Sequence, residues 1–308
     1  MRRLAYFGLI VSLLVAFTMS LSPMTFAKTL KIGLGDPIDS DQGVLALRFK
    51  KIVETTSGGR YTVDIFPAGQ LGDEQKMVKD SRRGSIDGAV VAVNNITPFA
   101  KSVGILTLPY LIQSFDDAVA ITTGALGEKW RNVLIKDAGV RVLGWSYSNF
   151  RVLTNSKKPV TMLSDLKGLK IRVPKNAIMI ATWKALGAEP IPMAWPETFT
   201  ALQQRVVDGQ DNPHITNYTM KFYEVQKYLS FTGHVYTVSY PLISEVVYQK
   251  LPADVQTVLN QCGVDATKAT VDFSIEADQR VVDLAKSKGM EVNQADVNAF
   301  VEASQPIW

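Results

Sequence analysis

The stretch GLKIRVP, residues 168–174, predicts a short strand that ends beside an arginine. Its apolar residues alternate with Lys170 and Arg172, which is the period of a strand, and Pro174 ends the strand because proline has no N–H to donate. Ligands of open α/β sheets lie beyond the carboxyl ends of the strands. A guanidinium at that place offers a carboxylate two parallel hydrogen bonds. We therefore expect Arg172 to hold an anionic ligand, with a surface salt bridge as the alternative.

The chain before this stretch predicts strands and helices in alternation. Apolar residues at every second position indicate strands at 29–34 and 61–65, and an almost unbroken apolar run indicates a buried strand at 86–93. Helical spacing of apolar residues predicts helices at 43–56 and 73–83. This order is typical of a parallel sheet, so the sequence predicts an α/β fold.

The same pattern starts again in the second half of the chain. Helices are predicted at 176–186 and 196–207, and a short strand at 191–193. A polar, turn-rich segment at 208–213 follows, and then a helix at 216–228. A second α/β domain is the natural interpretation.

Two extended stretches and one long helix are expected to connect the domains. We place the first crossing inside 147–154, and 234–248 returns the chain to the first domain. The helical pattern at 251–288 makes a rod of about 55 Å at ~1.5 Å per residue, which is longer than a small domain is wide. The expected division is 28–148 plus 238–277 for lobe I and 149–237 plus 278–308 for lobe II.

The chain has 308 residues, of which 46% are hydrophobic and 20% charged, and two domains fit that length. Arg2 and Arg3 precede an apolar run that leads to Ala27, which is the pattern of an export signal at 1–27 with cleavage near Ala27. A retained membrane anchor is the alternative. Removing the signal takes two arginines and no acids, so the formal charge falls from +4 to +2. We expect an exported protein, and no cluster of basic residues indicates a nucleic-acid partner.

Residues for catalysis or metal binding are sparse. The two histidines, His214 and His234, have no thiol partner and no further histidine or cysteine at metal-ligand spacing. A nucleophile elbow and a phosphate loop are both lacking in the sequence. The single cysteine, Cys262, is interpreted as a packing residue of the long helix. The sequence therefore favours neither an enzyme nor a metal or cofactor site.

Groups suited to an anion stand at predicted strand ends. Arg151 and Arg172 with the amide of Asn212 describe a carboxylate clamp, although Asn212 before Pro213 is equally typical of a turn. Five aromatic residues are candidates for the walls of this clamp, with core packing as the alternative: Trp145, Phe150, Trp195, Phe199 and Tyr236. Four further residues are expected at the same edge of the first sheet: Gly35, Glu74, Asn94 and Asn95.

Four segments carry a resemblance to a known family. They are FPAGQLGDE at 66–74, LKGLKIRVP at 166–174, TALQQRVVDGQDNP at 200–213 and MKFYEVQKYL at 220–229. In this order they resemble the substrate-binding subunit, DctP type, of tripartite ATP-independent periplasmic (TRAP) transporters. The resemblance runs from about Lys31 to the end of the long helix.

This resemblance implies a two-lobed periplasmic binding protein of the type II-like kind. Each lobe would be a mostly parallel sheet flanked by helices, and crossing strands and a long helix would join the lobes. Such proteins close on a carboxylate and deliver it to TRAP membrane subunits, and we expect a monomer.

The resemblance also implies roles for single residues. Arg172 would be the principal carboxylate ligand, Arg151 a second cationic contact and Asn212 an amide donor. Asp211 stands where the family usually has glutamate, which leaves Asn212 in place. The other implied contacts are Trp195 as a cover, Glu74 with Asn94 and Asn95 from the other lobe, and the backbone of Gly35.

The alternatives are a periplasmic enzyme or a receptor-linked sensor that acts on a carboxylated small molecule. Glu74 with Asn94 and Asn95 favours a sugar acid or hydroxy acid as ligand, because these side chains accept from and donate to hydroxyls. The aromatic residues Trp145, Phe150 and Trp195 favour a flat or apolar body instead.

Overall fold

The structure is a computed structural model and describes residues 27–308, apart from the side chains at 269, 270, 274, 275 and 277–279. The predicted export signal, except for Ala27, lies outside the described residues. Among the described residues, no helix combines the length and the apolar character that crossing a bilayer requires.

Lobe I is built on three parallel strands in the order β2-β1-β3. These are β1 (Lys28–Leu34), β2 (Tyr61–Phe66) and β3 (Gly88–Ala92), connected by α2 (Asp41–Thr56) and α3 (Glu74–Arg83). The order of strands and helices is the predicted one, and each predicted segment lies within about two residues of the observed element.

Capping residues fix where the two connecting helices begin. The Ser40 side chain accepts a hydrogen bond from the N–H of Gly43, and the predicted cap Asp73 accepts one from the N–H of Lys76. Loops 35–40 and 67–73 connect the carboxyl ends of β1 and β2 to these helix starts. This places Glu74, the first residue of α3, next to the opening of the sheet.

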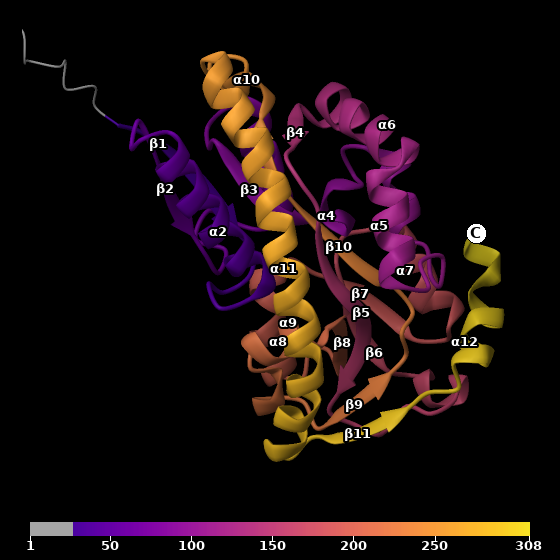
Figure 1. The fold of residues 1–308 in the computed structure, drawn as a ribbon. Coiled ribbons are helices and arrows are strands. Elements are labelled where there is room, and N and C mark those ends of the chain that lie inside the picture. The colour runs from indigo at the N-terminus through magenta and orange to yellow at the C-terminus, as the bar shows by residue number, and fades with distance from the viewer. Residues whose placement is uncertain (1–26) are drawn as a thin grey trace, which may run out of the picture.

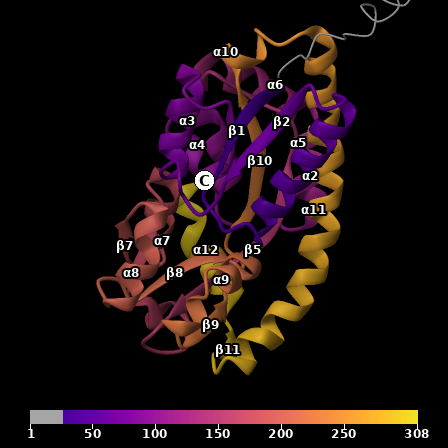
Figure 2. The same cartoon turned by 90° about the vertical axis from the view of Figure 1, so that its left-hand side faces the viewer.

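Lobe II contains a second parallel group, β8 (Gly209–Pro213), β6 (Lys170–Val173) and β7 (Glu189–Pro192). Helices α7 (Ala177–Ala185) and α8 (Thr198–Gln203) flank it. Figure 2 shows this lobe below the strands and helices of lobe I. The prediction of a two-lobed α/β fold is confirmed.

Two long antiparallel strands join the lobes. Strand β10 (Tyr236–Ser244) pairs with β3, and β5 (Ser146–Asn155) pairs with β10 over its first half and with β8 over its second. The change of partner falls between Phe150 and Arg151, inside the stretch where the sequence predicts the first crossing. The lobe boundaries given above remain predictions.

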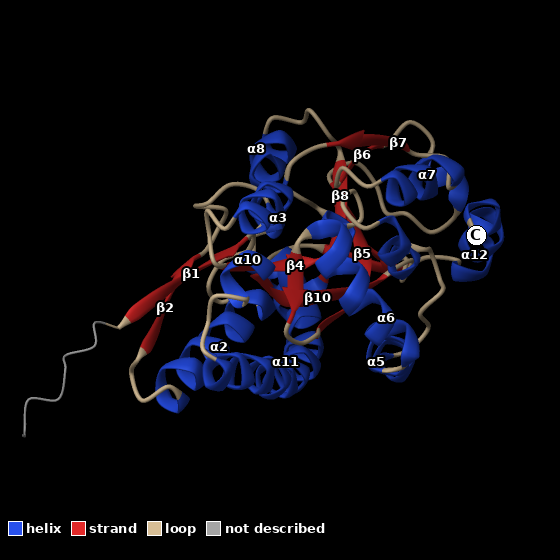
Figure 3. Ribbon diagram, turned by 90° about the horizontal axis from the view of Figure 1, so that it is seen from above, coloured by secondary structure: helices blue, strands red, loops and turns tan. Residues whose placement is uncertain are grey.

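The longest helix, α11 (Ala253–Ser287), runs along both lobes, as Figures 1 and 2 show. It packs beside α2 in Figure 3 and also contacts β5, α9 (His214–Thr219) and β11 (Glu291–Gln294). Gly263 lets this helix approach the sheet closely, because a Cβ there would lie 2.2 Å from the backbone O of Leu143. These contacts fit the expectation that the long helix connects the two lobes.

The remaining elements complete the layers around the two sheets. Buried residues of β1, β2, α2 and α11, Cys262 among them, form one core of lobe I, and buried residues of β3, β10, α3 and α6 form another. Trp145 lies in the second core. The other helices and strands are α4 (Val93–Ile96), α5 (Phe115–Thr123), α6 (Ala125–Val133), α10 (Glu245–Tyr248), α12 (Val297–Ser304), β4 (Val140–Val142) and β9 (Tyr228–Phe231).

Two predictions about lobe II are wrong. In the segment 208–213, predicted as turn, residues 209–213 form strand β8, and all five are buried. The segment 216–228, predicted as one helix, contains the end of α9, a 3-10 turn at Phe222–Glu224 and the first residue of β9. Strand β8 and the start of β9 at Tyr228 both pair with β5, which lies between them in the sheet.

Candidate functional site

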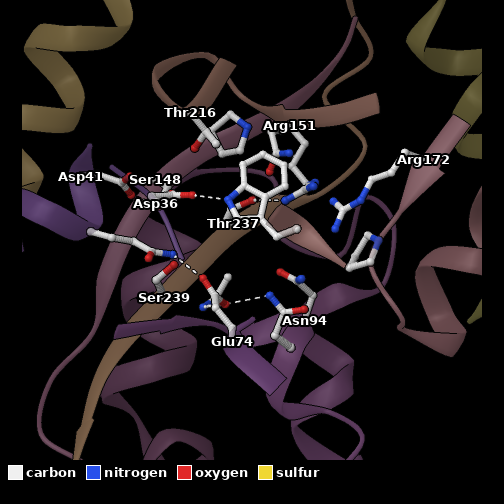
Figure 4. Close-up of a pocket in the computed structure, with 17 residues that line it drawn as sticks. Asp36, Asp41, Glu74, Asn94, Ser148, Arg151, Arg172, Thr216, Thr237 and Ser239 are labelled. Atoms are coloured by element: carbon white, nitrogen blue, oxygen red, sulfur yellow. Dashed lines mark hydrogen bonds between the residues drawn. The ribbon is translucent and has the colours of Figure 1, made fainter. Parts of the chain in front are cut away.

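A pocket lies between the lobes, at the carboxyl ends of parallel strands from both sheets. Asp36 follows β1 and Asn94 follows β3, while Arg172 and Asn212 stand at the ends of β6 and β8. Figure 4 shows side chains of both lobes directed into it. The pocket therefore lies where the strand-end argument from the sequence expects a ligand.

Arg172 supplies a buried cation to the pocket. Its side chain is 4% exposed, and Nε and Nη2 donate to the backbone O of Met193 at 3.2 and 2.8 Å. The guanidinium lies 5.1 Å from the centre of the Trp195 ring. Burial, together with the nearby charge of Arg151, lowers the pKa of Arg172 to about 10. Among the described residues, no acidic side chain forms an ion pair with it.

Arg151 also lines the pocket, but its charge is already balanced. Its Nε donates to Asp211 Oδ2 at 2.6 Å, its Nη2 donates to the backbone O of Asp211, and its Nη1 donates to Thr237 Oγ1 at 3.3 Å. His234 Nε2 lies 2.9 Å from the same Asp211 Oδ2. Burial alone would raise the pKa of Asp211, but Arg151 and His234 hold it well below its usual value.

Asn212 and Trp195 complete the lobe II side of the pocket. Asn212 Nδ2 donates one hydrogen bond to Gln210 Oε1 at 2.7 Å, which leaves the second N–H of this amide for another partner. Trp195, in a 3-10 turn at Trp195–Glu197, donates from Nε1 to Asp36 Oδ1 at 2.8 Å. The Trp195 indole of lobe II is therefore hydrogen-bonded to Asp36 of lobe I, and its ring lies beside the Arg172 guanidinium.

Glu74 faces these residues from lobe I. Its carboxylate accepts from Gln42 Nε2 at 2.8 Å, from the N–H of Ala92 at 2.8 Å and from Asn95 Nδ2 at 2.7 Å. Burial raises the pKa of this carboxyl despite the three donors. A Cβ on Gly35 would lie 2.7 Å from Glu74 Oε1, so a side chain at this position would displace the carboxylate.

The structure brings together seven of the predicted ligand residues around the pocket and places two elsewhere. The seven are Glu74, Asn94, Asn95, Arg151, Arg172, Trp195 and Asn212. Phe150 and Tyr236 pack edge to face with ring centres 4.9 Å apart, and Phe150 borders a separate apolar cavity with Tyr110 and Trp308. Successive side chains of a strand point to opposite faces, so the neighbours Arg151 and Thr237 reach the pocket instead.

Several polar residues of the pocket were not predicted. Asp36 and Asp41 come from lobe I, and Ser148, Thr237 and Ser239 come from the crossing strands. The polar pair on β10 carries a usable signal, because Thr237 and Ser239 are two residues apart in an otherwise apolar run, which is the spacing of one face in a regular strand. Asp36 and Asp41 lie in loop and helix-start sequence, where acidic residues are common for other reasons.

Comparison with known proteins identifies the family. The model of the family described as bacterial extracellular solute-binding protein, family 7, or DctP, matches residues 37–308. This chain belongs to that family. The family-7 chain is 36% identical to a solute-binding protein of Verminephrobacter eiseniae, over 91% of this chain and 83% of the relative. It is 31% identical to the 2,3-diketo-L-gulonate-binding periplasmic protein YiaO of Escherichia coli, over 96% of this chain and 90% of the relative.

The solved structures agree with this assignment. A TRAP periplasmic solute-binding protein from Polaromonas sp. JS666, bound to D-erythronate, is 34% identical with a TM-score of 0.88, and the match covers 91% of this chain and 92% of that one. The family resemblance seen in the sequence is thus confirmed. Members of the family are periplasmic transport binding proteins rather than enzymes, and they work with membrane subunits.

Proposed function

We propose that this family-7 protein captures a small organic acid in the pocket between its lobes and delivers it to the membrane subunits of a TRAP transporter. Arg172 carries the proposal. A guanidinium that is 4% exposed, and that has no acidic partner among the described residues, is costly unless an anion joins it. A ligand carboxylate would supply that anion and two parallel hydrogen bonds.

The opposite wall supports a sugar acid or hydroxy acid as the ligand. Glu74, Asn94 and Asn95 offer acceptors and donors to hydroxyls from lobe I. D-erythronate in the Polaromonas structure, and the diketogulonate named for YiaO, are acids of this class. No observation favours an enzyme or a sensor over this function.

Hydrogen bonds between the lobes support capture by closure. Asn176 Nδ2 donates to the backbone O of Asn94 at 3.0 Å and to Thr97 Oγ1 at 2.8 Å, and Gln75 Nε2 donates to the backbone O of Lys175 at 3.1 Å. A ligand that touches both lobes would add to these contacts and exclude water, which strengthens its ion pair with the arginine.

The proposal also includes the export of the protein, its oligomeric state and its ligand contacts. The signal at 1–27 is cleaved near Ala27, and the mature chain acts in the periplasm as a monomer with the lobe boundaries predicted from the sequence. The ligand contacts are the seven residues that meet at the pocket, with the backbone of Gly35 behind Glu74.

A thermal-shift screen of the mature protein tests the proposal, followed by titration calorimetry of the acids that raise the melting temperature. The panel comprises D-erythronate, galactonate, glucuronate, succinate and a 2-oxo acid. We expect at least one sugar acid to bind, and Arg172→Ala to lose about 3–5 kcal/mol of its binding free energy. Arg48→Ala, which removes an exposed arginine of α2, is the matched control. Equal affinity of Arg172→Ala and the parent protein would exclude the clamp.

A further inference from the structure

Two acidic residues of the pocket have no role in the carboxylate clamp. Asp36, just after β1, is 6% exposed, and Asp41, the first residue of α2, is 1% exposed. Both line the pocket. Figure 4 shows them together with Ser148 on one side of the pocket and Arg172 on the opposite side. The pocket therefore has a cationic end and an acidic end.

The acidic end holds acceptor atoms that lack donors. Asp36 Oδ1 accepts from Trp195 Nε1, and Asp41 Oδ2 accepts from the hydroxyl of Ser148. Asp41 Oδ1 and Gln42 Oε1 are buried and accept no hydrogen bond of standard geometry within the described part of the chain, although the N–H groups of Gln42 and Asp41 lie close enough to the Asp41 carboxyl to counter part of the rise that burial causes in its pKa. Buried acceptors are rarely left in this condition, because the cost of burying a polar atom is then not offset. Asp41 and Gln42 both line the pocket, so two adjacent residues bring these acceptors to its wall.

The chemistry of this end excludes several kinds of ligand group. A second carboxylate would meet Asp36, Asp41 and Glu74 together, and like charges in a buried site repel strongly. Burial, with Asp41 and Glu74 close by, already raises the pKa of Asp36 well above its usual value. Within the residues that the structure describes, no group of three or more acidic, histidine or cysteine side chains is arranged to hold a metal ion. Neutral hydrogen-bond donors therefore fit the acidic end of the pocket best. Hydroxyl groups of the ligand would supply such donors.

We infer that Asp36, Asp41 and Gln42 select the ligand by accepting hydrogen bonds from hydroxyls at the end of its carbon chain remote from the carboxylate. The protein therefore binds polyhydroxylated monocarboxylic acids and rejects the matching dicarboxylic acids. This inference rests on the proposed function, because Arg172 must hold the carboxylate at the other end.

Matched pairs of acids test the inference on the parent protein by titration calorimetry. D-erythronate differs from meso-tartrate, and galactonate from galactarate, only in having a hydroxymethyl group where the partner has a second carboxylate. We expect the monocarboxylic member of at least one pair to bind about tenfold tighter or more, since a hydrogen bond to a charged group is replaced by repulsion. Equal or tighter binding of both diacids would overturn the inference. So would tighter binding of 4-aminobutyrate, whose end is an ammonium, than of either aldonate.

Substitutions at the acidic end provide the second test. Asp41→Asn removes the charge and one acceptor, so we expect about a tenfold loss of affinity for the bound aldonate and a smaller difference between aldonate and diacid. Asp36→Asn should act in the same direction. Asp39→Asn, an exposed residue of the same segment, is the matched control and should bind as the parent does. Melting curves establish that each variant is folded.

The outcomes separate this inference from the proposed function. If both pocket variants bind and discriminate as the parent does, the acidic end does not select the ligand, while loss of binding in Arg172→Ala still supports the clamp. If neither aldonate binds the parent, the inference is wrong, and the clamp is then judged on the other acids of the screen. If Arg172→Ala binds as the parent does, the proposed function itself fails.

Discussion

Asp211 holds Arg151 from two sides, since its carboxylate accepts from Nε at 2.6 Å while its backbone O accepts from Nη2. Arg172 has no such partner and donates only to the backbone O of Met193 among the described residues. The two arginines therefore differ in kind although both line the pocket. One is a fixed, neutralised part of the wall, and the other has its charge available for a ligand.

Arg172→Lys tests whether geometry or charge matters at the clamp. Lysine keeps the positive charge but loses the planar fork, so it cannot make two parallel hydrogen bonds to a carboxylate. We expect the affinity for the best acid of the panel to fall by about 1–3 kcal/mol, less than for Arg172→Ala. Titration calorimetry at low and moderate salt measures the loss. Unchanged affinity would show that a point charge is sufficient.

Asp211→Asn should destabilise the fold because it leaves Arg151 buried without a counter-charge. We expect the free energy of unfolding, from urea titration at pH 7, to fall by about 3–5 kcal/mol. Asp39→Asn, at an exposed position, serves as the control. A loss below 1 kcal/mol would mean that the pair contributes little to stability.

The stability that Asp211 contributes should also depend on pH. Burial opposes ionisation of Asp211, but Arg151 and His234 dominate and lower its pKa in the folded state. The stabilisation is therefore complete above the unfolded-state pKa of about 3.9 and is lost as the pH falls through the folded-state pKa. The stability difference between the parent and Asp211→Asn should be constant near neutral pH and shrink in acid. A difference that grows in acid would contradict this assignment.

The strand-end residues could be predicted because ligands of an open α/β sheet lie beyond the carboxyl ends of its strands. Arg172 precedes a proline that ends a strand, and Glu74 follows a helix cap, so both positions follow from local sequence. Strand β8 was not predictable in this way, because its polar residues are typical of a turn. They are buried as a strand because they satisfy one another: Gln210 Nε2 donates to Thr154 Oγ1 and Asn217 Oδ1, and Asn212 donates to Gln210. Those partners come from elements that only the tertiary fold brings together.

Phe150 and Tyr236, two of the predicted aromatic residues, lie away from the pocket for a different reason. Phe150 and Tyr236 lie next to pocket residues in sequence, but alternation along β5 and β10 turns them to the opposite face. A positive φ of 79° at Asn149 and a register shift between Thr237 and Val238 disturb the alternation at the crossing. Near the crossing, the face of the sheet on which each side chain lies depends on backbone irregularities that cannot be read from the sequence.

Asn176→Ser should weaken closure without disturbing lobe II. Serine can still cap α7, as the Asn176 side chain does by accepting from the N–H of Met179, but it cannot reach Asn94 and Thr97. Losing two hydrogen bonds between the lobes should cost about 1–3 kcal/mol of ligand affinity. Calorimetry measures the affinity, and small-angle X-ray scattering should show a larger radius of gyration for the ligand-free variant. Parent-like values in both measurements would mean that closure does not depend on this contact.

Asp36→Asn should stabilise the ligand-free protein while weakening binding. Burial, with the charges of Asp41 and Glu74, raises the pKa of Asp36, so its ionised form is disfavoured in the folded state. The parent therefore loses stability as the pH rises through the unfolded-state pKa of about 3.9, and the neutral variant does not. We expect a melting temperature a few degrees above that of the parent at pH 7, with the difference vanishing near pH 4. A variant that melts below the parent at pH 7 would show that the Trp195 contact requires a full carboxylate.

Gly35→Ala should act on the ligand through Glu74. The added Cβ would lie 2.7 Å from Glu74 Oε1 and 3.0 Å from its Cγ, so the carboxylate must leave its bonds with Gln42, Ala92 or Asn95. We expect a loss of about 1–3 kcal/mol in ligand affinity. Combining Gly35→Ala with Glu74→Gln in a double-mutant cycle separates this route from general strain. If the effect passes through Glu74, the double variant loses less than the sum of the two single losses, whereas strict additivity would place the action of Gly35 elsewhere.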